Sequence, residues 1–210
     1  MHLLTRGGCP TCLNRYQHGR DNWETLHEHP ADVREVRTAL DAMHGSQCAY
    51  CETATGDDWH IEHLWARSAH PQRTFLWGNL FASCQRKESC GTYKDRGGRP
   101  YQAADLIDPS TEDPDAFLFF TADGRVQPRA ALAGSALHRA LETIRVFNLN
   151  APVLVLYREQ VVAMLLADEP DVIEFMNGLL PGDRRAWVID FVNSYCSEGW
   201  QTPVRHLLTA

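Results

Sequence analysis

The sequence lacks long apolar runs, and it is also poor in lysine. Its 210 residues include no stretch close to the roughly 20 apolar residues that a membrane-spanning helix requires. The first residues lack the apolar segment of a secretory signal peptide. These absences argue against a membrane-embedded or exported protein, so we expect a cytoplasmic one. Only two of the 20 basic residues are lysines, a bias that we attribute to genome composition.

An excess of positive charge is missing as well. The 20 Lys and Arg residues are outnumbered by 27 Asp and Glu residues. The formal net charge of −7 argues against a protein that binds nucleic acid tightly without a partner. The charge is unevenly placed, however. Residues 60–100 hold seven basic and three acidic residues, a net +4, which leaves −11 for the rest of the chain. This local basic segment is compatible with phosphate binding at one site, or with chance clustering on a solvated surface.

Apolar residues recur at helical spacing in two parts of the chain, and no internal repeat is visible. Residues 32–43 form the first pattern, with Asp32 near the start of the predicted helix and Gly45 as its stop. After Pro128, a second set of stripes predicts a helix that ends near Asn148. Three further helices are expected at about 152–167, 170–179 and 183–197, with Pro181-Gly182 between the last two.

Short β-structure is expected between these helical parts. Ala116–Phe120 predicts a strand, residues 122–124 a turn, and Val126 a returning strand. Residues 46–99 differ from the rest because they are punctuated by glycine and rich in Cys, His and Trp. We therefore expect a mostly helical α+β protein with one short β-hairpin and a central segment unlike a plain hydrophobic core.

The cysteines point to metal binding. Seven cysteines, an odd number in a chain without signs of export, make a disulfide framework less probable than metal ligation or buried thiols. Cys48 and Cys51 form a Cys-x2-Cys knuckle, and Cys84 and Cys90 form a later pair. Together they would give zinc the four thiolates of a closed tetrahedral site. The alternative is two unrelated pairs of buried thiols.

The remaining cysteines carry weaker signals. Cys196 lies in a strongly helical stretch and is expected to be a small buried apolar residue. Cys9 and Cys12 are either free thiols in an ordered N-terminal loop or half of a second zinc site that would include His18. No matching second pair is present for such a site.

The segment His60-Ile61-Glu62-His63 lies between the two cysteine pairs. In an extended strand, alternation places His60 and Glu62 on one face, and His63 at the strand end can turn toward a cleft. A carboxylate that holds a divalent cation beside a neutral histidine that takes a proton from water would suit metal-assisted phosphodiester hydrolysis. Polar residues on a solvated strand are the alternative.

The order of these parts resembles the HNH endonuclease motif with its ββα-metal finger. The Cys-x2-Cys knuckle is followed by Glu62-His63, by Asn79-Leu80 and by a cysteine pair that leads into Lys94. The resemblance implies that Glu62 binds the catalytic metal and that His63 is the general base. It also implies that Asn79 braces a loop and orients His63, and that the four cysteines hold structural zinc.

One position departs from the pattern of this family. The family usually has His or Asn directly after the last cysteine as the second ligand of the catalytic metal, whereas this chain has Gly91. Asp95, one turn further along the expected helix, carries a carboxylate that suits Mg²⁺ or Mn²⁺. His60 is the other candidate.

The resemblance extends to one branch, the PtuB-like nucleases of Septu-type and retron-associated anti-phage systems. It is strong over residues 46–99 and loose elsewhere. It implies a zinc-stabilised finger over residues 46–110, with a loop and helix over 1–45 and a hairpin plus helical region over 111–210 packed against it. Such proteins work beside an ABC-type ATPase, which the resemblance implies as a PtuA-like partner here.

We therefore expect an HNH endonuclease with structural Zn²⁺ and catalytic Mg²⁺ or Mn²⁺, acting on DNA, with RNA as the alternative substrate. A zinc-stabilised binding module that has lost catalysis is the other alternative, because Gly91 replaces a family ligand. Alone, the chain is expected to bind nucleic acid weakly. Phosphate contacts are expected from basic residues that belong to or flank the motif: Arg67, Arg73, Arg86, Lys94, Arg96 and Arg99.

Overall fold

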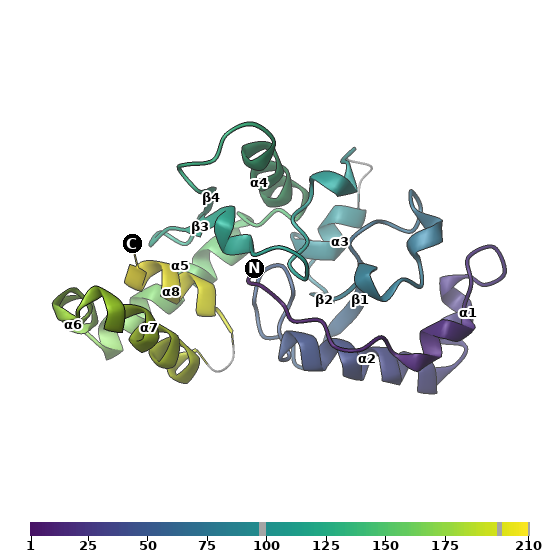
Figure 1. Ribbon diagram of the computed structural model, residues 1–210, viewed down its shortest axis with the longest axis horizontal. Coiled ribbons are helices and arrows are strands. Elements are labelled where there is room, and N and C mark those ends of the chain that lie inside the picture. Colours follow the sequence, from purple (N-terminus) through teal and green to yellow (C-terminus); the bar gives the residue numbers. More distant parts are fainter. Residues whose placement is uncertain (97–99, 197–198, 210) are drawn as a thin grey trace.

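The computed structural model describes residues 1–96, 100–196 and 199–209, and it confirms the expected α+β class (Figure 1). About half of it is helical, with two small antiparallel sheets. The α-helices of the described chain are α1 (Trp23–His27), α2 (Pro30–His44), α3 (Cys90–Asp95), α4 (Gly134–Val146), α5 (Pro152–Asp168), α6 (Val172–Gly178), α7 (Pro181–Tyr195) and α8 (Gln201–Thr209). The strands are β1 (Trp59–His63), β2 (Leu80–Cys84), β3 (Leu118–Phe120) and β4 (Val126–Pro128). Short 3-10 turns cover Thr11–Arg15, Pro71–Arg73, Trp77–Asn79, Ala103–Asp105 and Pro114–Ala116.

The antiparallel pair of β1 and β2 carries the predicted motif. Glu62 lies opposite Phe81, and His63 lies opposite Leu80. All five residues of β2 are buried, and Figure 1 shows the strand pair between α2 and α3, both of which contact β2. Because an isolated two-stranded hairpin is only marginally stable, this cover on both sides is what makes the strand pair a firm support for residues 60–63.

Helix α2 forms where the sequence predicts it. Pro30 occupies the first position, where a missing backbone N–H costs no helical hydrogen bond, and Asp32 lies in the first turn. Gly45 follows the helix in the left-handed conformation with φ 58°, which glycine adopts without steric cost. Val36 and Leu40 are fully buried, so the predicted apolar face is the one that meets the core.

The C-terminal helices lie close to their predicted ranges, with two differences. Pro181 begins α7 instead of separating two helices, because proline fits the first position of a helix. The helix ends at Tyr195, and residue 197 of the predicted range lies outside the described residues. The sequence patterns predict neither the five-residue α1 nor α8, which contains Pro203. Within the described ranges, no helix is both long enough and apolar enough to cross a membrane.

The buried apolar residues form two clusters. The larger one extends from Met1 to Leu154 and includes the cysteine-rich segment, the β3–β4 hairpin and the start of α5. The second extends from Leu165 to Leu208 and belongs to α5, α6, α7 and α8. Helix α5 therefore contributes to both clusters. The predicted division at residues 45 and 110 stays a prediction, since the larger cluster draws on all three segments.

Two buried charged residues connect segments that are far apart in the sequence. The Glu52 carboxylate pairs with the α-amino group of Met1 and accepts a hydrogen bond from the backbone N–H of Thr202 in α8 (3.0 Å). Arg158 of α5 is fully buried, and its Nη1 donates to the carbonyl oxygens of Gly124 (3.1 Å) and Leu149 (2.8 Å). Because buried charges are costly unless they are paired or hydrogen-bonded, these contacts fix α5 and α8 against the rest of the fold.

Candidate functional site

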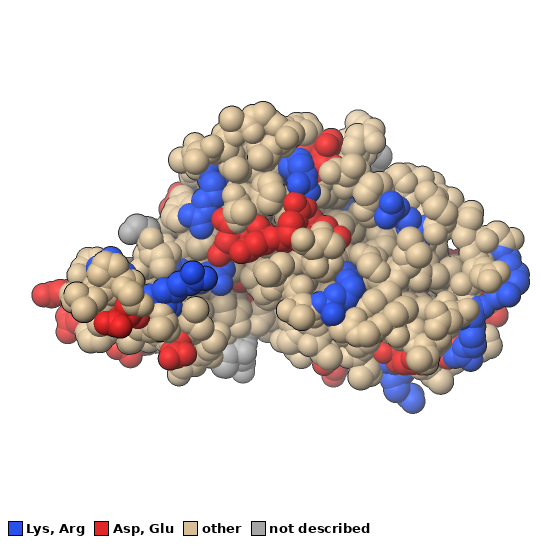
Figure 2. Space-filling model, viewed as in Figure 1, with Lys and Arg blue, Asp and Glu red and all other residues tan. Residues whose placement is uncertain are grey.

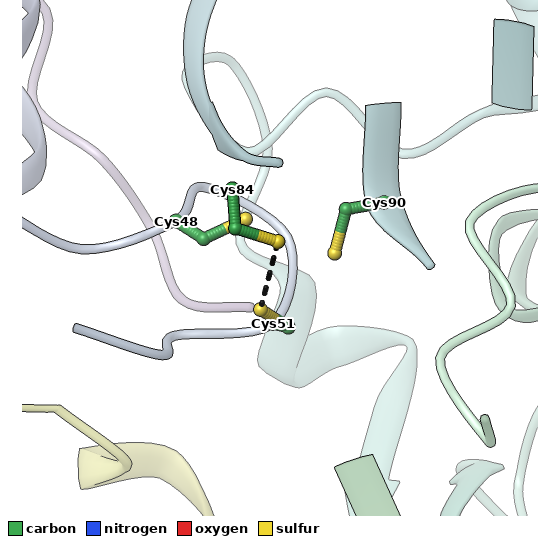
Figure 3. Close-up of side chains that lie close together, drawn as sticks. All are labelled: Cys48, Cys51, Cys84 and Cys90. Atoms are coloured by element: carbon green, nitrogen blue, oxygen red, sulfur yellow. Dashed lines mark hydrogen bonds between the residues drawn. The ribbon is translucent and has the colours of Figure 1, made fainter. Parts of the chain in front are cut away.

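Four cysteines from three segments meet in the core. Cys48 and Cys51 lie in the turn after α2, Cys84 ends β2 and Cys90 begins α3. All four are buried, and their Sγ atoms lie within 4.8 Å of one another. Figure 3 shows the sulfur atoms turned toward a common space. The prediction that these two pairs come together is confirmed, and among the described residues this is the one group of three or more His, Cys, Asp and Glu side chains that could hold a metal.

The spacing of the sulfur atoms fits a tetrahedral metal site. Zinc–sulfur bonds of about 2.3 Å place neighbouring sulfurs about 3.8 Å apart, and the Sγ atoms of Cys51 and Cys84 are 3.9 Å apart. Hydrogen bonds from the other thiols lower the pKa of Cys51, whereas the pKa values of Cys84 and Cys90 are raised. Zinc binds the thiolate form of cysteine, so binding at this cluster would be coupled to ionisation of the four thiols.

The backbone at Cys90 is held in an uncommon conformation. Its φ is 60°, a left-handed value that costs free energy for a residue with a side chain. The Cys90 N–H donates to the carbonyl oxygen of Phe147 (2.8 Å), and the Phe147 ring stacks on Tyr50 at 4.0 Å. The packing against Phe147 thus holds the conformation that turns the Cys90 sulfur toward the other three.

The other cysteines lie elsewhere. Cys9 is exposed and Cys12 is buried, and neither belongs to a second metal-binding group with His18 in the described part of the chain. Cys196 is buried in the C-terminal apolar cluster, as its sequence context predicts.

Glu62 lies at the centre of a buried charged cluster. Lys94 Nζ is 2.9 Å from Glu62 Oε1 and 2.5 Å from Asp95 Oδ1, and His60 Nε2 is 3.2 Å from Glu62 Oε2. The side chains of Glu62 and Lys94 are 2% and 0% exposed. Burial by itself would raise the pKa of Glu62, but the charge of Lys94 and the hydrogen bond from His60 lower it. Glu62 is therefore a carboxylate at neutral pH.

The position of Lys94 corrects one expectation. Lys94 is not available to contact nucleic acid in this structure, because its ammonium is buried between Glu62 and Asp95 and lies 3.3 Å from the Tyr101 hydroxyl. The neighbouring carboxylates raise its pKa despite burial. Its role is to balance the charges of the two carboxylates.

The residues around Glu62 partly fit a hard divalent cation. Glu62 Oε1 is buried, with the Lys94 ammonium 2.9 Å away, and Asp95 adds a half-exposed carboxylate. Lys94 Nζ contacts both carboxylates, so they lie close together, and burial and the charge of Glu62 raise the pKa of Asp95. Carboxylate oxygens are the ligands that Mg²⁺ prefers. A cation at this position would share the two carboxylates with Lys94.

Gly91 leaves room for the Glu62 side chain. A Cβ atom at this position would overlap the Glu62 side chain, including Oε2. The space directly after Cys90 is thus filled by the carboxylate of Glu62. Any side chain at residue 91 would displace it.

His63 is oriented by the loop that follows β1. Its Nε2 lies 3.0 Å from the carbonyl oxygen of Thr74, and its ring meets the Trp23 ring edge-on at 4.4 Å. Because a carbonyl oxygen can only accept, Nε2 carries the proton and Nδ1 carries the lone pair. Burial lowers the pKa of His63 to about 4. The imidazole is therefore neutral at neutral pH.

Asn79 braces the same loop. Its Oδ1 accepts from the Trp65 N–H (2.7 Å), and its Nδ2 donates to the carbonyl oxygens of Trp65 and Arg73 (both 3.1 Å). The side chain is buried, so one amide closes both ends of the loop. Since Arg73 directly precedes Thr74, this clamp also fixes the carbonyl group that orients His63.

The predicted phosphate-contacting arginines take different positions. Arg96 is exposed, while Arg67 lies over the Trp23 ring near Glu24, and Arg73 lies over the Trp65 ring. Arg86 is half-buried against Tyr157 of α5. Arg67 and Arg73 therefore border the His63 loop. Arg99 lies outside the described residues.

Three contacts of the site are not indicated by the sequence patterns. The Thr74 carbonyl group is a backbone atom, and any residue type could supply it. Trp23 and Tyr101 lie outside the segment that holds the motif, so only the fold brings their rings to His63 and Lys94. The one available signal was the aromatic character of these residues, which a core role explains equally well.

No protein-family model matches the chain, and no curated protein matches it.

The contact between Gly91 and Glu62 leads to a stability prediction. Gly91→Ala should lower the free energy of unfolding by about 2 kcal/mol or more, since the added methyl group must push a buried, paired carboxylate aside. Gly78→Ala is the matched control, because a Cβ at Gly78 meets open space. Urea unfolding of the two variants measures the difference, and equal losses would contradict the close contact.

Proposed function

We propose that the protein is a metal-dependent HNH endonuclease that hydrolyses phosphodiester bonds and whose finger is stabilised by zinc. The setting of His63 carries the proposal: a neutral imidazole, held by a backbone carbonyl group, directly follows the buried Glu62 in β1. Both residues lie on a strand pair that a four-cysteine cluster joins to the following helix. The resemblance to the HNH motif agrees with this arrangement in the order of its residues.

His63 acts as the general base in this proposal. With its Nε2–H donated to Thr74, the lone pair on Nδ1 is free to take a proton from the attacking water. The lowered pKa keeps the ring in the neutral form that a base requires. Asn79 is a positioning residue, because it holds the backbone next to Thr74 and does not itself meet the substrate.

Glu62 and Asp95 are the residues that would hold Mg²⁺ or Mn²⁺. When bound, such a cation would polarise the scissile phosphate and stabilise charge on the leaving 3′-oxygen. Lys94 offsets the repulsion between the two carboxylates and so keeps them close together. We expect a product with a 5′-phosphate.

The substrate and partner are part of the same proposal. DNA is the favoured substrate and RNA, including tRNA, is the alternative, since the residues of the site do not distinguish deoxyribose from ribose. The strongly acidic charge outside residues 60–100 supports a need for an ABC-type ATPase partner to engage nucleic acid tightly. The proposed role is that of a nuclease effector in anti-phage defence within the cytoplasm.

A zinc-stabilised binding module is the second candidate. It is favoured by Gly91, which removes the usual second metal ligand, and by Lys94, whose ammonium already balances Glu62. A module of this kind would keep the finger and its zinc but would leave plasmid DNA and tRNA intact with every divalent cation.

Elemental analysis tests the structural zinc. We predict about one zinc per chain, and we predict that Cys51→Ser loses it and lowers the free energy of unfolding by more than about 4 kcal/mol. Cys9→Ser is the matched control, because Cys9 is exposed and stands apart from the cluster. A stable wild-type protein without metal would refute the zinc assignment.

Nuclease assays test the catalytic role of His63. Purified protein, with and without the ATPase partner, is incubated with plasmid DNA or tRNA over a series of Mg²⁺ and Mn²⁺ concentrations. We predict that His63→Ala lowers the cleavage rate at least about 100-fold, the low end of the contribution of a general base. His138→Ala should retain the rate, since this histidine lies on the surface of α4 and pairs with Asp105.

The structural state of the His63→Ala variant decides how the result is interpreted. Zinc content and thermal stability close to those of the wild type would assign the loss of cleavage to the missing base. Full cleavage by the variant would refute the mechanism. Intact substrates under all conditions with the wild-type protein would favour the binding module.

A further inference from the structure

A hollow of about 500 Å³ lies away from the finger, between the hairpin region and the C-terminal helices. Its walls come from the turn before β3, from the end of β4, and from α6, α7 and α8. Figure 2 shows basic side chains over the region of α7 and α8, next to a group of acidic side chains. None of the residues that line the hollow belongs to the proposed catalytic site or to the cysteine cluster.

The hollow carries an excess of positive charge in an acidic protein. Its lining includes two aspartates, Asp113 and Asp115, against four arginines: Arg129, Arg184, Arg185 and Arg205. With His206 neutral, the excess is two charges. Arg205 Nη2 donates to Asp115 (2.6 Å), whereas the other three arginines pair with no carboxylate in the described chain.

Polar groups form a framework around part of this basic lining. His206 is 1% exposed, its Nδ1 accepts from the Phe120 N–H (3.0 Å), and its Nε2 lies 3.2 Å from Asp115 Oδ1. Arg184 donates to the carbonyl oxygens of Asn177 and Leu179 at the end of α6.

Two donors in this framework remain unused. The Nε atoms of Arg184 and Arg205 are buried without a hydrogen-bond partner within the described chain. Unpaired buried donors are rare in native proteins, and the described chain alone leaves these two guanidinium groups incompletely satisfied.

Apolar side chains also line the hollow. Val188 and Ile189 of α7 and Leu208 of α8 line it, and Ile189 is 46% exposed. A lining that combines arginines with apolar side chains suits a ligand with a doubly charged group at one end and a flat, weakly polar group at the other. A volume of about 500 Å³ lies in the range of small-molecule sites.

We infer that this hollow binds a nucleoside phosphate. The phosphate dianion matches the excess of two positive charges and accepts bidentate hydrogen bonds from guanidinium groups. The base and sugar lie against Ile189 and Leu208. Such a ligand is available either as a free nucleotide or as the 5′-phosphorylated end of a nucleic-acid strand.

Calorimetric titration of the zinc-loaded full-length protein tests the inference. We expect AMP to bind with a Kd below about 100 μM, and adenosine and inorganic phosphate to bind at least about tenfold more weakly. Arg185→Gln and Arg184→Gln should each weaken AMP binding about tenfold. Arg34→Gln should leave it unchanged, because Arg34 is an exposed arginine on α2, remote from the hollow in the sequence and absent from its lining.

The outcomes separate the two sources of the ligand. A 5′-phosphorylated dinucleotide that binds more tightly than AMP would assign the site to a strand end, and equal or weaker binding would assign it to free nucleotides. No saturable AMP binding up to about 5 mM would overturn the inference. So would phosphate binding as tightly as AMP, or an Arg185→Gln variant that folds and binds like the wild type. These binding measurements do not depend on nuclease activity.

Discussion

The convergence of four cysteine sulfurs is the constraint on which the cysteine-rich segment of residues 46–99 depends. Cys48 and Cys51 come from the turn after α2, Cys84 from the end of β2, and Cys90 from the start of α3. None of these three segments is long enough to bury a core of its own. A metal bound by all four thiolates would contribute its binding free energy directly to folding, and it would offset the strained backbone at Cys90.

Burial of charge is the second organising feature of the molecule. A zinc ion with four thiolates would carry two negative charges. The Arg158 guanidinium is buried nearby: burial lowers its pKa, and the charges of Cys51 and Cys90 partly offset this effect. Lys94 plays the corresponding role for Glu62 and Asp95. In both places a cation from a helix compensates at least one anion from another segment, so charge balance and tertiary packing stabilise each other.

Residue patterns in the sequence predict the parts of this fold whose signals are local. The first turn of α2 with Asp32, the stop at Gly45 and the Cys-x2-Cys knuckle each depend on neighbouring residues. The burial of Lys94 depends instead on packing around Glu62, which no spacing rule describes. The same holds for the hollow, whose arginines extend from Arg129 to Arg205 along the chain.

The candidate site divides in the same way. Residue type and order along the chain predict roles for Glu62, His63 and Asn79, because a carboxylate, an imidazole and an amide each have a distinct chemistry. Their geometry cannot be predicted in this way. The Thr74 carbonyl group could come from any residue type, and the Trp23 ring that meets His63 comes from α1, far from β1 in the sequence.

The hydrogen bond between Thr202 and the Glu52 carboxylate has a consequence for folding during synthesis on the ribosome. The two residues are 150 positions apart, and a ribosome adding about 5 to 20 residues per second needs roughly 8 to 30 s to cover that distance. During this interval the knuckle is already synthesised, yet the Glu52 carboxylate lacks the partner that α8 supplies. The Cys48–Cys51 knuckle therefore reaches its final surroundings only after Thr202 has been synthesised and has left the ribosome.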